Sequence, residues 1–449
     1  MNKYFSTILL ATLSNTAVQA QSLQPAPRLV VAITIDQLRT DCIEQFIPLY
    51  TPNGFKKLLQ NGMVYESATY PFSPVDRSSA IATIFTGTAP NYHNIVGTQW
   101  LDRNTLQPIS CTDDDKYQTS PQKLATSTVG DEIKIASQGS AIVYGIAIDK
   151  DAAVLSAGHA ADGAYWFNDK KQNWTTSKYY NTESQKWITS YNSTHSHKSE
   201  NEDIASLAID CVNNHAMGRD EIPDLLAVTL SAKDGSLPNW QTSMETVYRT
   251  LDQTLANIIT HIEDNVGANH VIFVITGTGY TEEPVIDYQK YRIPTGTFYI
   301  NRSGNLLNMY LSAIYGQGKY VETYFHNQIY FDRKLLEQKR IDISEILSRS
   351  RDFLIQNAGV SNAHTSPYSP NVSGDIIIDV TPGWQLLNEN TQEKYIPRAS
   401  YVPFPIIFYG AGTKAEHIKD LVTVDRIAPT LSKSIHIRAP NASSAIPLF

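Results

Sequence analysis

The sequence has little of what marks several protein classes. Its three cysteines, Cys42, Cys111 and Cys211, form neither a disulfide framework nor a C-x-x-C metal site, and they allow at most one bridge without indicating which. The net charge is -8 and there is no long run of lysine or arginine, which argues against nucleic acid as a partner. Beyond the N-terminal segment, no stretch approaches the roughly 20 apolar residues that a membrane span needs.

The N-terminus has the pattern of a secretory signal. Residues 1–20 contain one lysine, an apolar stretch around Ile8–Leu13 and a small-x-small ending at Val18–Ala20. This pattern predicts a signal peptide cleaved after Ala20, which is too short and too polar toward its end to be a membrane anchor. We therefore expect an exported, soluble mature chain, in the periplasm or associated with the outer membrane.

Short apolar runs alternate with helical patterns along the rest of the chain. Residues 28–36 (RLVVAITID) form a β-branched run that breaks at a charged residue, as expected for a central parallel strand buried on both faces. Runs of the same kind occur at 141–148, 225–230, 270–275, 375–380 and 405–408. Because strands that alternate with helices imply an α/β sheet, we expect functional residues at the carboxyl ends of these strands.

Two segments interrupt the alternation. Residues 162–202 are rich in Trp, Tyr, Asn, Ser and Lys, and residues from about 281 to 372 are rich in Tyr and polar side chains. We expect both to be insertions that form a cap over the edge of the sheet, within one domain spanning 28–449. The aromatic residues of the first segment have two interpretations, as the core of the cap or as a partner-binding patch. They are Tyr165, Trp166, Phe167, Trp174, Tyr179 and Tyr180.

Long stretches of the chain resemble a known family. They include LVVAITIDQLRTD at 29–41, TIFTGTAPNYHNIVG at 83–97, AGHAADGAYWF at 157–167 and PIIFYGAG at 405–412. These stretches resemble the alkaline phosphatase superfamily, in its exported bacterial branch of zinc phosphatases with a threonine nucleophile, related to the nucleotide pyrophosphatase/phosphodiesterases. The resemblance implies a mostly parallel central sheet flanked by helices, with an inserted cap subdomain. It also implies, for active members, phosphoryl transfer between two zinc ions.

The resemblance indicates where the family's catalytic positions fall in this chain. The first metal-binding Asp matches Asp36, but the threonine nucleophile matches Arg77. The phosphate-binding Asn matches Thr98. The two cationic residues of the family's K-D-R motif match Asp149 and Asp151, which would repel a phosphate.

The remaining zinc ligands of the family are largely replaced. A second metal-binding Asp matches Asp234, but no His follows it, and the alignment places Pro238 or a neighbour there. The family's Asp-His pair matches Thr278 and Gly279, and its late His matches Pro403. Two residual carboxylates do not suffice for two zinc ions that each take about four ligands, and without metal no hydroxyl is activated. These departures from the family pattern therefore predict no bound zinc or other cofactor and no catalytic residue.

We interpret Arg77 as a replacement for the missing metal ions. We expect its guanidinium to lie between Asp36 and Asp234 and to replace the missing cations, because buried carboxylates need a partner to stay ionised. The planar fork of arginine suits this task. The two carboxylates are otherwise interpreted as paired carboxylates at strand ends, with a role as residual metal ligands as the alternative.

Other candidate residues have structural interpretations beside functional ones. Ser78 and Ser79 adjoin Arg77, but no G-x-S-x-G elbow surrounds them, so we expect them to cap a helix rather than to attack a substrate. The remaining candidates, interpreted as structural or solvated rather than metal-binding, are His159, His195, His197 and Asp113–Asp115.

The sequence thus predicts an exported pseudoenzyme of the alkaline phosphatase fold. Its expected role is a binding, scaffolding or complex-forming component of the cell envelope, with a protein partner that the sequence does not identify. The alternative is a diverged hydrolase of phosphate, phosphodiester or sulfate esters that uses one metal or none, which Asp36 and Asp234 favour. A third possibility is a pocket that binds a cationic or neutral ligand without turnover, since four acidic residues, Asp36, Asp149, Asp151 and Asp234, stand against Arg77 and Lys150.

Overall fold

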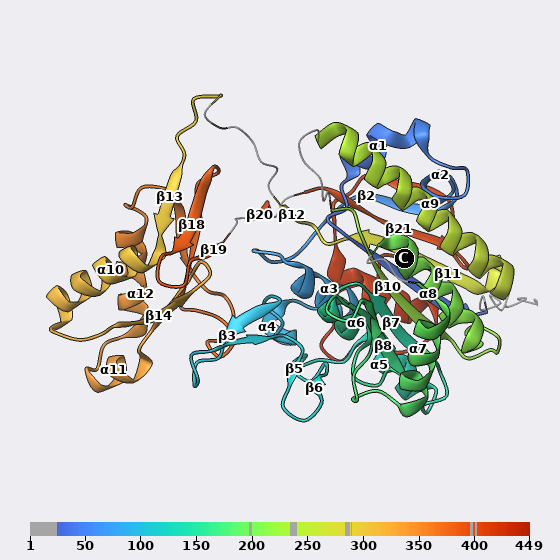
Figure 1. The fold of residues 1–449 in the computed structure, drawn as a ribbon, viewed down its shortest axis with the longest axis horizontal. Helices are drawn as coiled ribbons and strands as arrows, with labels where there is room; N and C mark the ends of the chain where they lie inside the picture. The colour runs from blue at the N-terminus through green and yellow to red at the C-terminus, as the bar shows by residue number, and fades with distance from the viewer. Residues whose placement is uncertain are drawn as a thin grey trace, which may run out of the picture.

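The computed structural model describes residues 25–196, 200–233, 240–282, 288, 290–395, 398–399 and 402–449. The predicted signal peptide at 1–20 lies outside these residues. Figure 1 shows a larger lobe, in which helices surround a sheet, and a smaller lobe built from residues 296–395. No helix in the described ranges is long and apolar enough to cross a membrane.

The larger lobe is built on a ten-stranded mixed sheet. Its strands are β1 (Leu29–Asp36), β2 (Met63–Thr69), β7 (Val143–Ala147), β8 (Gly163–Asn168), β9 (Asn173–Thr175), β10 (Asp224–Ser231), β11 (Val271–Gly277), β21 (Phe404–Gly410), β22 (Glu416–Ile418) and β23 (Val422–Thr423). Their order is β22-β2-β21-β11-β1-β10-β7-β8-β9, with β23 paired to β2. Strand β1 is parallel to both of its neighbours, and all its residues are buried, as expected where helices cover both faces.

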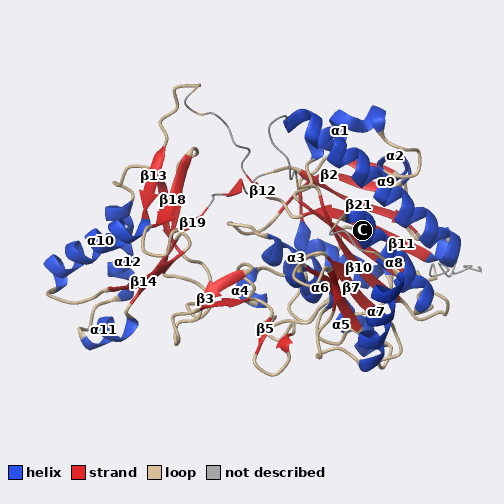
Figure 2. Ribbon diagram, in the orientation of Figure 1, coloured by secondary structure: helices blue, strands red, loops and turns tan. Residues whose placement is uncertain are grey.

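Two hydrophobic cores fill the two faces of this sheet. Alternation along β1 directs Val30 and Ala32 into one core and Val31 and Ile33 into the other. Helices on both sides complete the cores (Figure 2). The first core is covered by α3 (Arg77–Thr86), α5 (Val129–Ala136), α6 (Lys150–Ala157) and α13 (Ile427–Ser434). The second is covered by α1 (Thr40–Phe46), α2 (Phe55–Asn61), α7 (Thr182–Thr194), α8 (Asn201–Asn214) and α9 (Trp240–Val266).

The first predicted insertion, 162–202, extends the central sheet and does not form a cap. Strand β8 pairs in parallel with β7, and β9 pairs with β8. Tyr165, Phe167 and Trp174 are buried in the second core. This segment differs in pattern from the inner strands because wide aromatic side chains, rather than aliphatic ones, fill the core near the sheet edge.

The smaller lobe contains most of the second predicted insertion and has its own core. One sheet has the order β13-β18-β19 and the other β14-β15-β17-β16. Residues 375–380, expected in the central sheet, instead form an inner strand of this second sheet, where a β-branched run is buried equally well. The elements are β13 (Gly296–Tyr299), α10 (Ile300–Tyr315), β14 (Val321–Phe325), β15 (Gln328–Phe331), α11 (Arg333–Gln338), α12 (Ile343–Leu354), β16 (Val360–Thr365), β17 (Ile376–Val380), β18 (Trp384–Asn388) and β19 (Glu393–Tyr395).

Candidate functional site

Most positions that the family resemblance assigns to a site meet at the carboxyl ends of parallel strands. Asp36 is the last residue of β1, and Thr278 directly follows β11. The first turn of α6, which follows β7, carries Asp151 and is preceded by Asp149. Arg77 begins α3, which packs against α6. This is the edge at which α/β sheets carry their functional groups.

Arg77 is bound by two carboxylates. Its Nε and Nη2 atoms lie 3.1 and 2.9 Å from the two oxygens of Asp151, and its Nη1 atom lies 2.8 Å from Asp149. All three guanidinium nitrogens therefore have a carboxylate partner, and the side chain is 20% exposed. Burial alone lowers the pKa of Arg77, but the Asp151, Asp149 and Asp36 carboxylates outweigh burial and raise it.

Among the described residues, Arg77 therefore pairs with Asp149 and Asp151 and not with Asp36 as predicted, and the predicted pairing with Asp234 is not tested. The guanidinium does balance carboxylates, but those are Asp149 and Asp151, because the first turns of α3 and α6 face each other. Asp36 acts on Arg77 only through the longer-range Coulomb attraction. Asp234 lies outside the described residues.

Asp151 is the buried anchor of this cluster. Its side chain is 7% exposed, and it accepts both Arg77 hydrogen bonds and one from the Ser78 hydroxyl at 2.6 Å. Burial raises the pKa of Asp151, but Arg77 and Ser78 lower it by more, so the carboxyl stays ionised. Burial likewise raises the pKa of Asp149, and here Arg77 reverses the shift only in part.

The two serines beside Arg77 have structural partners. Ser79 forms a capping box with Asp76 at the start of α3, which confirms its predicted capping role. Ser78 is fully buried and lies 3.0 Å from the hydroxyl of Thr98 as well as beside Asp151. Neither hydroxyl is presented to solvent as a nucleophile. Thr98 in turn donates its backbone N–H and its hydroxyl to Asp76.

Asp36 is held by hydroxyl groups. Thr278 donates to one carboxylate oxygen at 2.8 Å, and Tyr280 donates to the other at 3.2 Å. All three side chains are buried. Thr278, which stands where the resemblance places a metal ligand, thus donates a hydrogen bond to the Asp36 carboxylate. Tyr280 was not predicted, because its role depends on a contact with a residue 244 positions away.

Gly279 and Pro403 line a small hollow beside this cluster. It has a volume of about 150 Å³, and Tyr70 and Phe404 are among its other lining residues. Gly279 has a φ of 71°, and a Cβ atom built there would lie 2.7 Å from the Tyr70 ring. The backbone at 279 therefore has no room for the histidine that the family carries at this position.

The described residues do not fit a two-zinc centre. No group of three or more His, Cys, Asp or Glu side chains in the described part of the chain is placed to hold a metal ion. Zinc takes about four nitrogen, oxygen or sulfur ligands. Of the residual ligand positions, Asp36 is engaged by two hydroxyls, and Asp234 lies outside the described residues together with Pro238.

The other candidate residues have local partners. His159 contacts Asp131 at 2.9 Å and the backbone oxygen of Leu124 at 3.0 Å, which gives it a structural role. His195 contacts the Tyr191 backbone oxygen, whereas His197 lies outside the described residues. The carboxylates of the acidic turn accept hydrogen bonds from nearby backbone groups. Asp113 accepts one from Ser110 N–H, and Asp114 accepts one each from Lys116 N–H and Tyr117 N–H.

None of the three cysteines is in a disulfide. Cys42, Cys111 and Cys211 are free and buried. Burial is the main cause that raises the pKa of each thiol, to about 11 for Cys42. The single bridge that the cysteine count allows does not form. Buried thiols with raised pKa values are poorly reactive.

This arrangement defines an α/β protein of the alkaline phosphatase class, and comparison with solved structures supports the fold. Wild-type alkaline phosphatase PafA superimposes with a TM-score of 0.80 at 23% identity, covering 94% of this chain and 98% of that one. Murine ectonucleotide pyrophosphatase/phosphodiesterase 5 gives a TM-score of 0.57 at 14% identity, covering 91% and 95%.

The chain belongs to the type I phosphodiesterase / nucleotide pyrophosphatase family, whose sequence profile matches residues 30–401. Alkaline phosphatase PafA of Elizabethkingia meningoseptica is 24% identical over 520 residues, covering 94% of each chain. Alkaline phosphatase PhoV of Synechococcus elongatus is 23% identical over 536 residues, covering 97% of this chain and 96% of the relative.

Proposed function

We propose that this protein is a non-catalytic member of its family, a pseudoenzyme that binds a ligand or partner and does not hydrolyse phosphate esters. The observation that carries the proposal is the position of Arg77. A guanidinium stands where the family has its nucleophile, and all three of its nitrogens are committed to Asp149 and Asp151. A group that has no lone pair to donate does not attack phosphorus.

The charge of the cluster supports the same proposal. Two carboxylates, those of Asp149 and Asp151, contact the Arg77 guanidinium, and the Asp36 carboxylate acts on it at longer range, so the described cluster has an excess of negative charge. Lys150, the cation between Asp149 and Asp151 in the sequence, is paired with a different carboxylate, that of Asp113, at 3.5 Å. A phosphate dianion is repelled by such a cluster, whereas a cationic or neutral ligand is not. We therefore expect any ligand of this site to be cationic or neutral.

The expected location follows from the N-terminal pattern. Residues 1–20 have the features of a signal peptide, which supports export to the periplasm or an outer-membrane association. In that compartment we expect the protein to act as a binding or scaffolding component of an envelope complex, with a protein partner. The acidic net charge of -8 does not favour nucleic acid.

Metal analysis and activity assays test the proposal together. Purified protein is dialysed against zinc, its metal content is measured, and turnover of aryl phosphate, phosphodiester and sulfate ester is followed with and without chelator. We expect no stoichiometric zinc and no turnover above buffer. Stoichiometric zinc with turnover that the chelator abolishes would instead support the alternative, a diverged metal-dependent hydrolase.

A further inference from the structure

The imidazole ring of His159 lies between two hydrogen-bond acceptors. Its Nδ1 atom is 2.9 Å from the Asp131 carboxylate, and its Nε2 atom is 3.0 Å from the backbone oxygen of Leu124. A carbonyl oxygen has no hydrogen to donate, and neither has an ionised carboxylate. If Asp131 is ionised, both ring nitrogens must therefore carry a hydrogen, and His159 is an imidazolium ion.

The surroundings of Asp131 keep its carboxylate ionised. The backbone N–H groups of Thr128 and Ala160 donate to its two oxygens, at 2.8 and 2.7 Å. Asp131 also lies in the first turn of α5, where the helix dipole stabilises a negative charge. Burial raises the pKa of Asp131, but His159 and the two N–H groups lower it by more.

The same contacts hold the second proton on His159. Burial lowers the pKa of His159, but the Asp131 carboxylate and the Leu124 oxygen raise it by more, above the ordinary histidine value of about 6.5. Because the folded-state pKa is above the unfolded-state value, the stabilising contribution of His159 is complete below about pH 6.5. That contribution is lost as the pH rises through the folded-state pKa.

The Leu124 oxygen belongs to a turn that connects His159 with another segment of the larger lobe. We call residues 121–125 the Leu124 turn. The Ala125 N–H donates to the backbone oxygen of His93 at 3.1 Å, and His93 is the last residue of a short helix. The Leu124 side chain packs in the first core. Two consecutive peptide groups of the turn thus bond to two different segments.

A neutral His159 ring can serve only one of its two partners, because it carries a single N–H group. That N–H stays with Asp131, since a hydrogen bond to an ionised acceptor is about twice as strong as one between neutral groups. The Nε2 lone pair then faces the Leu124 oxygen. Leu124 is buried, so the loss of this donor costs free energy and the turn moves away from the ring.

The groups around His159 keep their own charge states at neutral and alkaline pH. Tyr179 donates its hydroxyl to the His159 backbone oxygen at 2.8 Å, and burial raises the pKa of Tyr179 above its ordinary value of about 10, so it stays neutral. The other charged side chains of α5 and of the Leu124 turn have separate partners, which are Arg438 for Glu132, Asp162 for Lys134, and the Asp113 backbone oxygen for Lys123.

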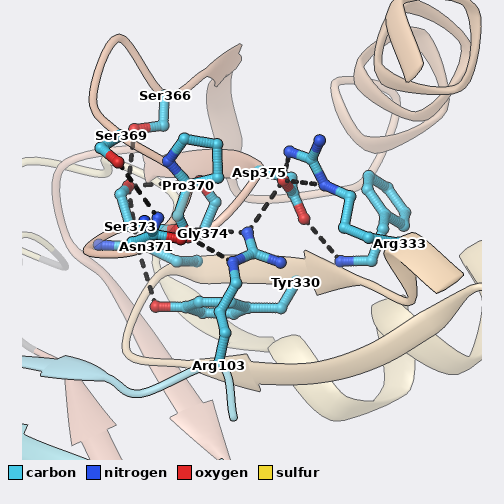
Figure 3. Close-up of polar contacts among 12 residues, drawn as sticks. Arg103, Tyr330, Arg333, Ser366, Ser369, Pro370, Asn371, Ser373, Gly374 and Asp375 are labelled. Atoms are coloured by element: carbon cyan, nitrogen blue, oxygen red, sulfur yellow. Dashed lines mark hydrogen bonds and ion pairs between the residues drawn. The ribbon is translucent and has the colours of Figure 1, made fainter.

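A second buried carboxylate, that of Asp375, has cationic partners that do not titrate. Figure 3 shows Arg103 and Arg333 approaching Asp375 from different elements. The Phe331 N–H also donates to Asp375, at 2.7 Å. Because arginine stays charged in this pH range, the hydrogen bonds of Asp375 should not respond to alkali. The Phe331 amide is therefore an internal reference for the Asp131 cluster, whose cation is a histidine.

We propose that His159 is a pH-sensitive link, which fastens the Leu124 turn when its ring is protonated and releases the turn when the ring is neutral. Release separates the segment after α6, where His159 lies, from the segment that ends at His93. The proposal does not depend on the proposed function, because it involves no ligand, metal or turnover. Its test measures amide exchange, so the two proposals fail independently.

Hydrogen exchange of the full chain tests the link, with mass spectrometry resolving single amides at about pH 6 and about pH 9. Each rate is divided by the intrinsic exchange rate at the same pH, which gives a protection factor. We expect the protection of the Ala125 amide to fall about tenfold from the lower to the higher pH. The protection of the Phe331 amide should change by less than about twofold.

Two variants distinguish His159 from other histidines. His159→Phe keeps a flat ring but removes both N–H groups, so the Ala125 amide should be as weakly protected at about pH 6 as it is in the wild type at about pH 9. The matched control is His417→Phe, because the His417 ring also lies near a carboxylate and a backbone oxygen, at 3.3 and 2.8 Å, but is 50% exposed. This control should keep the pH dependence of the wild type.

Each other outcome overturns the proposal. Equal protection of Ala125 at the two pH values means that no link is released. A pH dependence that persists in His159→Phe, or disappears in His417→Phe, assigns the effect to another group. A parallel change at Phe331 means that the whole fold loosens. If His159→Phe does not fold, Asp131→Asn removes the charge that holds the proton, so the fall in protection should move to lower pH, and an unmoved fall refutes the link.

Discussion

Arg77 and Asp151 form a bidentate pair, with nitrogen–oxygen distances of 3.1 and 2.9 Å, between the first turns of two neighbouring helices. The carboxylate of this pair is buried, and the Ser78 hydroxyl completes its coordination. In the related zinc phosphatases, the resemblance implies a nucleophile and a phosphate-binding cation at these two positions. Here the two charges neutralise each other, which leaves neither to bind a phosphate.

Arg77→Ala should strongly destabilise the protein. It leaves the Asp151 carboxylate buried with a hydroxyl but no cation, and breaking a buried pair in this way costs about 3–5 kcal/mol. Urea unfolding followed by circular dichroism measures the change. The control is Asp149→Asn, at a carboxylate that is 48% exposed, which should cost much less. An unchanged urea midpoint for Arg77→Ala would refute the pairing.

Protonation of the two carboxylates that bind Arg77 should change the stability of the folded protein in opposite directions. Burial raises the pKa of Asp151 but Arg77 lowers it by more, so its stabilising contribution is present above about pH 4 and is lost as the pH falls through the lowered folded-state pKa. The folded-state pKa of Asp149 is raised by burial, so its protonation on acidification favours the folded state.

Urea titrations across the pH range measure this difference. The stability gap between wild type and Asp151→Asn should be constant from about pH 8 to about pH 5 and shrink below about pH 4. The free energy of unfolding of the wild type, relative to that of Asp149→Asn, should rise as the pH falls. A parallel pH dependence of the two gaps would contradict the assigned directions.

Arg77→Thr should not restore hydrolysis. The substitution returns the hydroxyl of the family's nucleophile, but Thr278, Gly279 and Pro403 still occupy metal-ligand positions, so no zinc activates it. Aryl phosphate turnover with added zinc should stay at the buffer rate. Zinc-dependent turnover by this variant would mean that residues outside the described ranges complete a metal centre.

Gly279→Ala should destabilise the protein more than Gly139→Ala. Both glycines have positive φ, at 71° and 87°, so both substitutions carry backbone strain of about 1 kcal/mol. Only at 279 does the new Cβ meet a ring, that of Tyr70 at 2.7 Å, whereas at 139 nothing lies within 4 Å. Overpacking adds about 1–3 kcal/mol at 279. Equal losses in urea midpoint for the two variants would show that the Tyr70 ring moves aside without a measurable loss of stability.

The cysteines should be unreactive in the folded protein and fully titratable after unfolding. Cys42, Cys111 and Cys211 are buried and free, so a thiol reagent should modify none of them quickly under native conditions. In denaturant without reductant, the same reagent should count three thiols per chain. A count of one would reveal a disulfide.

Local patterns predicted much of the fold, because burial on both faces requires continuous apolar strands. The strand at 28–36 and its neighbours at 225–230 and 270–275 were predicted in this way, and they form the centre of the sheet. The same rule failed at 375–380, because a buried strand has the same composition in either lobe. It also missed β8, where aromatic side chains replace the aliphatic pattern.

The sequence by itself determined which residue types stand at the family's positions: an arginine at 77, acidic residues at 149 and 151, and no histidine at 279 or 403. Only the tertiary structure decided which of these charges meet. Asp36 and Arg77 both lie at the strand ends, but helix packing places the first turns of α3 and α6 together, so Arg77 is paired with Asp149 and Asp151. Asp36 is instead satisfied by hydroxyls brought from β11 and the residues that follow it. Such pairings depend on the separation and direction of side chains from distant segments, which local patterns do not encode.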